Sequence, residues 1–207
     1  MEVLRIIAGW AAFAVFHSLT VSDGYERLAR RAMGDRAFDA GHRLVFTLYS
    51  GVAFLVLLLY LRSVPDVPLF RLEGWPRLLC RAVQAGGAAF LLWTPWDLLE
   101  FVGLRQWRRR RRPEAGRNDR LFTGKAYGVV RHPLYLGISA IVAASPVQTR
   151  NTVVSTAMIL LYFYVGTFFE ERRLLRQFGD EYRAYRERVP RFLPVGRIFG
   201  SRRAHRP

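Results

Sequence analysis

Long apolar runs constrain this sequence more than any other feature. Four runs are each long enough to cross a hydrocarbon core about 30 Å thick, since a helix rises about 1.5 Å per residue. They are Val3 to Val21, Leu44 to Leu61, Leu78 to Leu104 and Val153 to Phe169. The second and fourth runs contain no acidic or basic side chain, whereas a half-buried soluble helix would present a polar face. The chain is therefore predicted to be an all-α membrane protein.

A fifth and shorter apolar segment, Leu134 to Val147, precedes the last of these runs. Basic stretches flank this pair of segments, from Arg105 to Arg131 and from Arg172 to Arg206, and basic loops favour the cytoplasmic side. The pair is thus predicted to be a helical hairpin that turns at Ser145 to Asn151. Counting back along the chain gives a polytopic helix bundle of about five spans with its N-terminus outside.

The chain beyond the last span predicts a C-terminal interfacial amphipathic helix. Gly179 interrupts the helical pattern, and Tyr182, Tyr185 and Val189 then recur at spacings of three and four. This short helix is expected to lie along the membrane surface with its arginines toward lipid headgroups, and to end at Pro190.

Composition fits a membrane protein, because 51% of the residues are apolar while the net charge of +16 lies mostly between the apolar runs. No small-residue cleavage site follows the first run, so this run is expected to be a retained helix. We predict an integral protein of a bacterial inner membrane. Residues 1–104 would form the first three spans, and residues 105–207 would carry a cytoplasm-facing site.

Several other kinds of chemistry are not indicated. Cys80 is the only cysteine, and no Cys/His spacing resembles a zinc or iron–sulfur site, so no metal is expected. The run Arg108 to Arg112 is interpreted as an anchor to anionic headgroups. Nucleic-acid binding is the alternative interpretation, but no base-stacking aromatic pattern accompanies the charge, and no nucleic-acid partner is expected. No pattern indicates an oligomeric state.

A polar loop enters an apolar helix between Thr123 and Gly137. Pro133 suits the first helical position, because it lacks the amide hydrogen that would have no partner there. Arg131 and His132 then lie at a helix N-terminus whose free amides favour an anion such as a carboxylate or phosphate. The alternative is a capped helix start at which Arg131 only contacts lipid headgroups.

Two adjacent carboxylates, Glu170 and Glu171, follow the last predicted span. Carboxylates near the bilayer boundary are costly unless they are paired or solvated. Glu170 has two interpretations: an ion pair with Arg173 at helical spacing, or an acceptor for a ligand amine or ribose. The loop before the fourth span ends at the same predicted depth, so the loop and the acidic pair are expected to face each other.

These residues resemble the isoprenylcysteine carboxyl methyltransferases and related bacterial membrane methyltransferases. The shared motifs are Tyr127, Arg131-His132-Pro133-Leu134-Tyr135-Leu136-Gly137, Glu170-Glu171, Phe178-Gly179, Glu181-Tyr182, Tyr185 and Val189-Pro190-Arg191. The resemblance implies S-adenosylmethionine bound at the cytoplasmic mouth of the bundle, under the C-terminal segment, with the acceptor arriving from the bilayer. By motif, the implied cofactor contacts are Leu121, Phe122, Tyr127, His132, Pro133, Leu134, Tyr135 and Glu170.

The chemistry of these side chains agrees with that cofactor. His132 and the helix N-terminus suit its carboxylate, Glu170 suits its ribose or amine, and the rings of Tyr127 or Tyr135 suit its sulfonium. The sequence departs from the resembled family at Gly166, where the isoprenylcysteine enzymes carry a basic residue for the substrate carboxylate. A prenylated protein is therefore not the expected substrate.

The N-terminal half is similar to the bacterial branch that includes methanethiol methyltransferases and proteins associated with nitric oxide metabolism. The similarity rests on Phe16-His17-Ser18 and on His42-Arg43-Leu44 leading to Tyr49-Ser50. His17 would act as a base or orient the acceptor, and the catalytic candidates are His17 and Arg131. The alternative for His17 is an interfacial histidine bonded to backbone or headgroups.

Three functional hypotheses follow. The first is a S-adenosylmethionine-dependent methyltransferase that acts on a small thiol or a lipid-like acceptor. The second is an NADPH-dependent membrane reductase, since sterol reductases have a similar C-terminal architecture. The third is a non-enzymatic membrane protein in which His17 and His42 ligate a haem. Binding of labelled cofactor separates the first two, and a Soret band would reveal the third.

Overall fold

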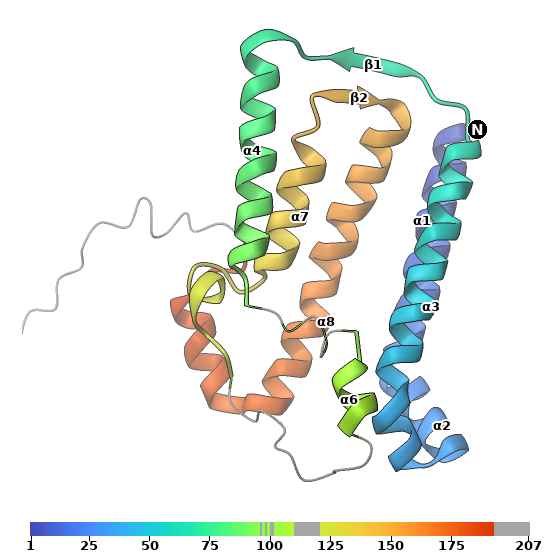
Figure 1. The fold of residues 1–207 in the computed structure, drawn as a ribbon, viewed down its shortest axis with the longest axis vertical. Coiled ribbons are helices and arrows are strands. Elements are labelled where there is room, and N and C mark those ends of the chain that lie inside the picture. Colours follow the sequence, from blue (N-terminus) through green and yellow to red (C-terminus); the bar gives the residue numbers. More distant parts are fainter. Residues whose placement is uncertain (96, 98, 100–101, 110–120, 193–207) are drawn as a thin grey trace, which may run out of the picture. The chain divides into compact units, whose positions relative to one another are not determined.

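The computed structural model describes residues 1–95, 97, 99, 102–109 and 121–192. These residues are mostly helical, as predicted (Figure 1). The elements are α1 (Glu2–Thr20), α2 (Asp23–Met33), α3 (Asp35–Ser63), β1 (Pro68–Arg71), α4 (Gly74–Trp93), α6 (Leu104–Arg109), η1 (Lys125–Gly128), α7 (Pro133–Ala143), β2 (Val147–Thr149) and α8 (Arg150–Arg188). The two strands pair with each other.

The described residues fall into two compact units that are interleaved along the chain. The first unit contains residues 1–70, residues 148–158 and the described part of 96–118. The second unit contains residues 71–95 and 159–192 together with the described part of 119–147. The predicted functional division at residue 104 stays a prediction.

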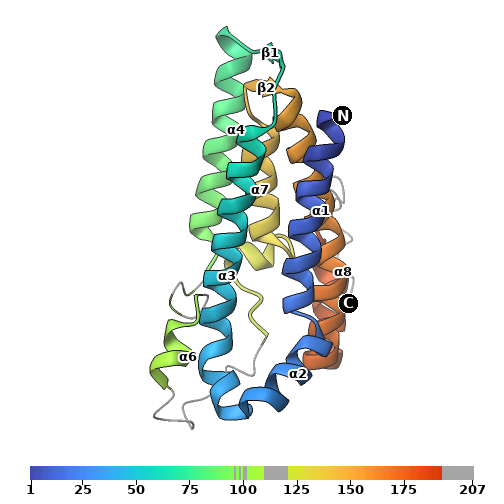
Figure 2. The same ribbon diagram turned by 90° about the vertical axis from the view of Figure 1, so that its right-hand side faces the viewer.

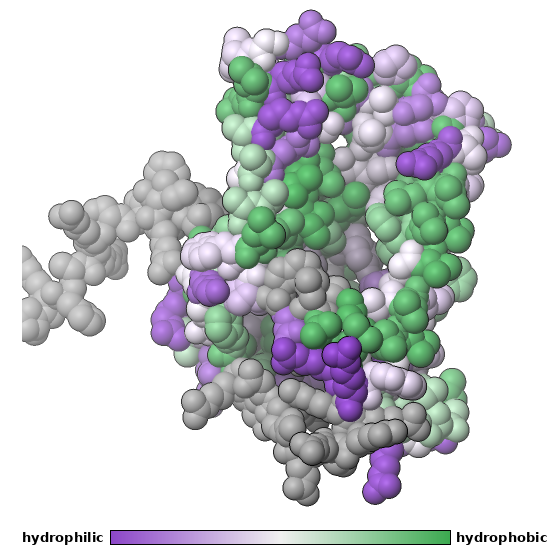
Figure 3. All heavy atoms as spheres, in the orientation of Figure 1, coloured by the Kyte–Doolittle hydropathy of each residue, from purple (hydrophilic) through white to green (hydrophobic). Residues whose placement is uncertain are grey.

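Three helices, α1, α3 and α8, are long and apolar enough to cross a membrane. They contain the predicted spans Val3 to Val21 (but for its last residue), Leu44 to Leu61 and Val153 to Phe169. Their exposed faces carry large apolar side chains, and Figure 3 shows such residues in green. Exposed apolar faces of this kind suit lipid better than water. The total of five spans stays a prediction, because α4 carries Arg77 and Arg81 and α7 has only 11 residues.

Two predicted helix boundaries were wrong. The run Leu78 to Leu104 is not one helix, because α4 ends at Trp93 and Thr94 is extended (φ −69°, ψ 121°). Thr94 precedes Pro95, and a residue before proline avoids the helical region. The segment predicted to reach Val147 ends at Ala143, because the chain there leaves the helix and enters β2.

Helix α2 was not predicted, although a local signal marks its start. The Ser22 side chain caps the helix by accepting a hydrogen bond from the Tyr25 amide, and Asp23 and Glu26 lie in the first turn. Gly34, with φ 81°, separates α2 from α3. The conformation at Gly34 is one that residues other than glycine rarely adopt.

Helix α8 is interrupted at Gly179 (φ 52°, ψ −122°), as the sequence predicted. We call the helical turns after this break, residues 180–188, the C-terminal segment. Its residues Tyr182 and Tyr185, together with Val189, are buried and pack against Leu121 and Phe178. The apolar face of the C-terminal segment is thus covered by protein, while the predicted location of this segment at the membrane surface stays a prediction.

In the second unit, α4 and α7 lie side by side (Figures 1 and 2), and two glycines lie at their contact. A Cβ on Gly87 would lie 2.9 Å from the Gly137 carbonyl oxygen, and a Cβ on Gly137 would lie 2.7 Å from the side chain of Leu91. The Gln84 amide also donates a hydrogen bond to the Ile141 carbonyl (3.0 Å). This close packing fixes α7, whose first turn carries the candidate site.

Candidate cofactor site

The loop before α7 is held by buried apolar residues. Ala126 in η1 and Val130 just after it are both fully buried, and the Val130 amide donates to the Ala126 carbonyl. Pro133 is the first residue of α7, as predicted. Helix geometry leaves the amides of Leu134 and Tyr135 without carbonyl partners inside α7. The start of α7 is therefore a fixed, polar helix end.

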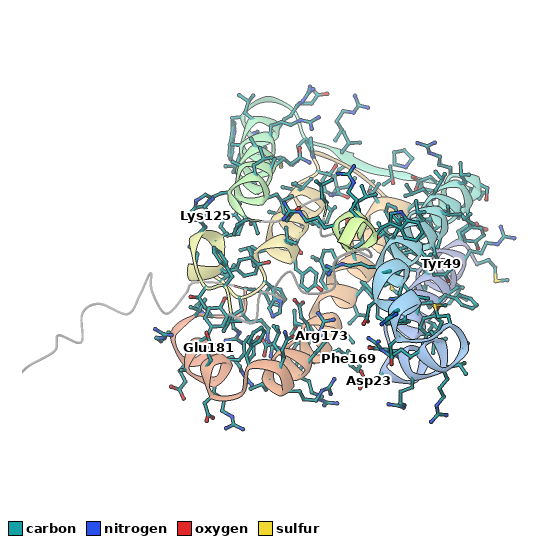
Figure 4. All side chains as sticks on the ribbon, turned by 60° about the horizontal axis from the view of Figure 1, so that its bottom comes forward. Asp23, Tyr49, Lys125, Phe169, Arg173 and Glu181 are labelled. Carbon is teal, nitrogen blue, oxygen red and sulfur yellow. The ribbon has the colours of Figure 1, made fainter. Side chains whose placement is uncertain are left out.

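Backbone hydrogen bonds connect the end of the C-terminal segment to the start of α7. The amide of Arg131 donates to the Pro190 carbonyl (2.9 Å), and the amide of His132 donates to the Arg191 carbonyl (3.3 Å). The Tyr185 hydroxyl donates to the carbonyl of Tyr127 in η1 (2.7 Å). Figure 4 shows side chains in this part of the second unit, with Lys125 on η1 and Glu181 on the C-terminal segment.

Glu171 is the centre of a buried charge cluster. Its carboxylate accepts hydrogen bonds from Arg131 Nε (2.9 Å) and Arg191 Nη2 (3.0 Å), and its Oε1 lies 3.2 Å from His132 Nε2. Arg186 adds a longer ion pair of 3.7 Å. The Glu171 side chain is 4% exposed, so this cluster is shielded from solvent. Three arginines thus surround one buried carboxylate. Their ion pairs connect α8 to the start of α7 and to the end of the chain's described part.

The charge state of Glu171 follows from these contacts. Glu171 lies beyond the apolar run that ends at Phe169, and α8 with its 39 residues is about twice as long as a hydrocarbon core requires. Burial acts to raise the pKa of Glu171, but hydrogen bonds from Arg191, His132 and Arg131 outweigh burial and hold its pKa at about 2. Glu171 is therefore ionised at all physiological pH values.

The Arg131 side chain is largely buried, whereas a side chain that binds lipid headgroups would be exposed. Its side chain is 9% exposed and pairs with Glu171. Its Nη1 also donates to the carbonyls of Arg186 (3.0 Å) and Val189 (2.7 Å), which are the free carbonyls at the end of the C-terminal segment. Arg131 therefore caps that segment, and the alternative of a lipid headgroup contact does not fit its burial.

Glu170 differs from its neighbour in exposure. Its side chain is 35% exposed, and its Oε2 lies 3.3 Å from His132 Nδ1. A hydrogen bond from Tyr135 also reaches its carboxylate, and Arg173 is close enough to act on its charge. The Glu170 side chain is exposed enough to contact a ligand, whereas that of Glu171 is buried.

Aromatic rings lie beside His132 at the start of α7. The rings of His132, Tyr135 and Phe163 are stacked in sequence, with centroids 5.6 Å and 4.7 Å apart. Phe122 meets Tyr127 edge to face at 6.2 Å. Burial raises the pKa of Tyr127, so its hydroxyl stays protonated. A carboxylate beside aromatic faces attracts cations and hydroxyl groups.

The structure thus brings together most of the residues predicted for cofactor binding. His132 and Glu170 are in contact, as expected for a shared polar site. Pro133 is buried at the start of α7, and Leu121 packs under the C-terminal segment. The predicted catalytic residue His17 lies in the first unit, at the end of α1. Most of the run Arg108 to Arg112, and the tail beyond residue 192, lie outside the described residues.

Sequence reasoning missed three residues of this site. Arg191 was part of a motif but was given no role, although it lies at the end of the described chain and pairs with Glu171 at 3.0 Å. Phe163 extends the stack of rings, and Phe192 lies 5.8 Å from the His132 ring. Phe163 stands seven residues before Glu170, or about two helical turns, which places both on one face of α8. This spacing was the feature of the sequence that could have identified Phe163 as part of the site.

The chain is similar to several bacterial proteins that are named as methyltransferases. Methanethiol S-methyltransferase 1 of Bradyrhizobium diazoefficiens is 30% identical over 188 residues, which are 89% of this chain and 64% of that protein. Methanethiol S-methyltransferase 2 of the same bacterium is 30% identical, over 92% of this chain and 72% of its own length. The methanethiol S-methyltransferase of Mycobacterium tuberculosis is 30% identical over 88% of this chain and 74% of that protein. No family model matches the chain, and no solved structure does.

The fold and the site define a helical membrane-type protein with a charged, ring-lined site at a helix start. The chain belongs to the isoprenylcysteine carboxyl methyltransferase-like family, in the group of the methanethiol S-methyltransferases. This membership supports a methyltransferase function. The resemblance seen in the sequence is thereby confirmed.

Proposed function

We propose that this chain is an integral membrane methyltransferase that uses S-adenosylmethionine and methylates a small thiol or a lipid-like acceptor. The observation that carries the proposal is Glu170, a partly exposed carboxylate in contact with His132 at the start of α7. The site of this carboxylate is lined by stacked rings, and the chain's relatives are named as methyltransferases of a thiol. Among the three hypotheses, these names favour the methyltransferase over the reductase and the haem protein.

The residues present fit this cofactor. Glu170 would accept hydrogen bonds from its ribose hydroxyls or its ammonium group. The amides of Leu134 and Tyr135, which have no carbonyl partner inside α7, would meet its carboxylate. The faces of Tyr127 and Tyr135 would lie near the sulfonium charge. Leu121, Phe122 and Pro133 would supply apolar walls. When bound, S-adenosylmethionine supplies an activated methyl group.

The surrounding residues would hold this site in one geometry. His132 bridges Glu170 and Glu171, which fixes the carboxylate that would receive the ligand. Arg131 is proposed as a positioning residue, because its guanidinium is already occupied by Glu171 and by the end of the C-terminal segment. That segment would exclude water from the site, and methyl transfer depends on aligned reactants more than on acid–base chemistry.

We further propose that α4 and α7 complete a bundle of five spans in a bacterial inner membrane, with the cofactor site facing the cytoplasm. The arginines between Arg105 and Arg131 support this orientation by their sign. His17 is proposed to orient or deprotonate the acceptor from α1. The relatives act on methanethiol by name, and a small thiol is accordingly the preferred acceptor.

Cofactor binding by the purified, detergent-solubilised chain tests the proposal. Titration calorimetry should detect one binding event with S-adenosylmethionine and none with NADPH. The substitutions Glu170→Ala and His132→Ala should each abolish that event, while Glu181→Ala, on the exposed side of the C-terminal segment, should leave it intact. Thermal unfolding of each variant establishes that it folds. If folded Glu170→Ala and His132→Ala variants bind the cofactor as the parent does, the site assignment is wrong.

Transfer itself requires a second assay. Protein incubated with S-adenosylmethionine labelled in the methyl group and with methanethiol should release labelled dimethyl sulfide as a volatile product. The Glu170→Ala variant should release none. Cofactor binding without transfer to any thiol or lipid tested would contradict the proposed activity.

A further inference from the structure

Helix α2 connects two helices that are long and apolar enough to cross a membrane. Val21 and Ser22 separate it from α1, and Gly34 separates it from α3. Two linking residues allow a Cα separation of at most about 11 Å between the end of α1 and the start of α2. Figure 2 shows α2 between the ends of α1 and α3, all within the first unit. The surface of a bilayer that α1 and α3 cross would therefore lie close to α2.

The sequence of α2 is amphipathic. Its apolar side chains recur at spacings of three and four, which places them on one side of the helix. They are Tyr25, Leu28, Ala29, Ala32 and Met33. Ala29 is the buried member of this set, whereas Leu28 is 67% exposed and Met33 is 51% exposed. The first unit thus covers little of the apolar side of α2.

A helix as short as α2 needs a surface that covers its apolar side. Helices of 11 residues are marginally stable by themselves in water, and in proteins they depend on burial of that side. The exposed apolar surface also continues from α1 into α2, because Leu19 and Val21 are both more than half exposed. The surface that covers α2 is therefore expected to be the one that also covers the apolar side chains of α1, which is lipid.

The acidic residues around α2 are already paired. The Arg30 guanidinium lies 2.9 Å from Glu26, 3.2 Å from Asp35 and 2.8 Å from Asp39. It also lies over the ring of Phe38, 4.3 Å from the ring centroid. These contacts connect α2 to the start of α3, and they neutralise the acidic side chains that would otherwise repel an anionic surface.

A separate face of α2 is basic. Spacings of three and four place Gly24, Arg27, Leu28, Arg31 and Ala32 together, and we call these residues the basic face of α2. All five residues are exposed. Neither Arg27 nor Arg31 pairs with a carboxylate in the part of the chain that the structure describes. The basic face thus presents two guanidinium groups, beside an exposed leucine, that are available to an anion.

We propose that the basic face of α2 docks on the anionic headgroups of a phospholipid bilayer. Arg27 and Arg31 donate hydrogen bonds to lipid phosphates, because a guanidinium matches the geometry of a phosphate. Leu28 enters the boundary between headgroups and acyl chains, as the apolar residues of interfacial helices do. This contact holds the turn between α1 and α3 at the membrane surface. It involves the first unit alone and does not depend on the cofactor site.

Amide hydrogen exchange of the full chain in lipid nanodiscs tests this proposal. One kind of disc contains phosphatidylcholine alone, and the other contains phosphatidylcholine and phosphatidylglycerol in equal parts. Each arginine near an anionic surface strengthens binding about fivefold, so exchange in residues 23–33 should be up to about thirtyfold slower in the anionic discs. The double substitution Arg27→Gln and Arg31→Gln should remove this difference. Its exposed positions should leave the unfolding temperature in phosphatidylcholine discs unchanged.

Two controls make the result specific. Arg5→Gln removes a positive charge near the other end of α1, where Arg5 pairs with Glu2, and it should keep the difference between the discs. Inorganic phosphate added to the phosphatidylcholine discs should not slow exchange in residues 23–33. Equal exchange of the parent in both kinds of disc, a difference that persists in the double variant, or equal slowing by inorganic phosphate would overturn this inference. None of these results would bear on cofactor binding, which calorimetry measures separately.

Discussion

The substitution Glu171→Gln should strongly destabilise the second unit. Glutamine keeps the volume of the side chain but removes the charge that Arg131, Arg191 and His132 surround. The pKa of Glu171 is held at about 2 instead of the usual 4.5, which corresponds to about 3 kcal/mol of stabilisation of the charged form. Mutational data give about 3–5 kcal/mol for breaking a buried ion pair, so the two magnitudes agree.

Thermal unfolding in detergent, followed by circular dichroism, measures this loss. For a chain of this size about 3 kcal/mol corresponds to a fall in Tm of about 6–12 °C. The matched control is Glu181→Gln, an exposed carboxylate on the C-terminal segment (Figure 4), which should leave Tm unchanged. If Glu171→Gln melts within about 2 °C of the parent, the buried charge cluster does not fasten the segment and the reasoning fails.

Three further outcomes are expected. Because the pKa of Glu171 is lowered, its contribution to stability is fully present above about pH 4.5 and is lost as pH falls toward 2, so acid titration should unfold the parent over that range but change Glu171→Gln less. Gly137→Ala should lower Tm by several degrees, because the new Cβ would lie 2.7 Å from Leu91, and a parent-like melting curve would show that the helices separate easily. Tyr185→Phe should cost about 1 kcal/mol and weaken cofactor binding, since its hydroxyl donates to the Tyr127 carbonyl; unchanged calorimetry would contradict that role.

Helix positions were largely predictable, because hydropathy is a local property of the sequence. The spans at α1, α3 and α8 follow from uninterrupted apolar runs. The errors arose where a single residue overrides hydropathy: Thr94 before proline ended α4 early, and the capping hydroxyl of Ser22 began an unpredicted helix. Both signals were present in the sequence but are weaker than a hydrophobic run.

The sequence predicted the start of α7, where the site lies, but not which distant residues pair with Glu171. Pro133 marked the first residue of α7, and the motif placed His132 near Glu170 correctly. The sequence has 32 basic Lys and Arg residues, and nothing local shows that Arg191 is one that reaches Glu171. That pairing joins residues 20 positions apart across the break at Gly179, so it depends on the tertiary fold.

Amide hydrogen exchange with and without S-adenosylmethionine tests the central claim most directly. The account predicts slower exchange on cofactor addition in residues 126–137, around the start of α7, and in residues 167–175, around Glu170. Exchange in α3 should not change. Binding of the cofactor with protection confined to other segments, or no protection at a saturating concentration, would contradict the assignment of this site.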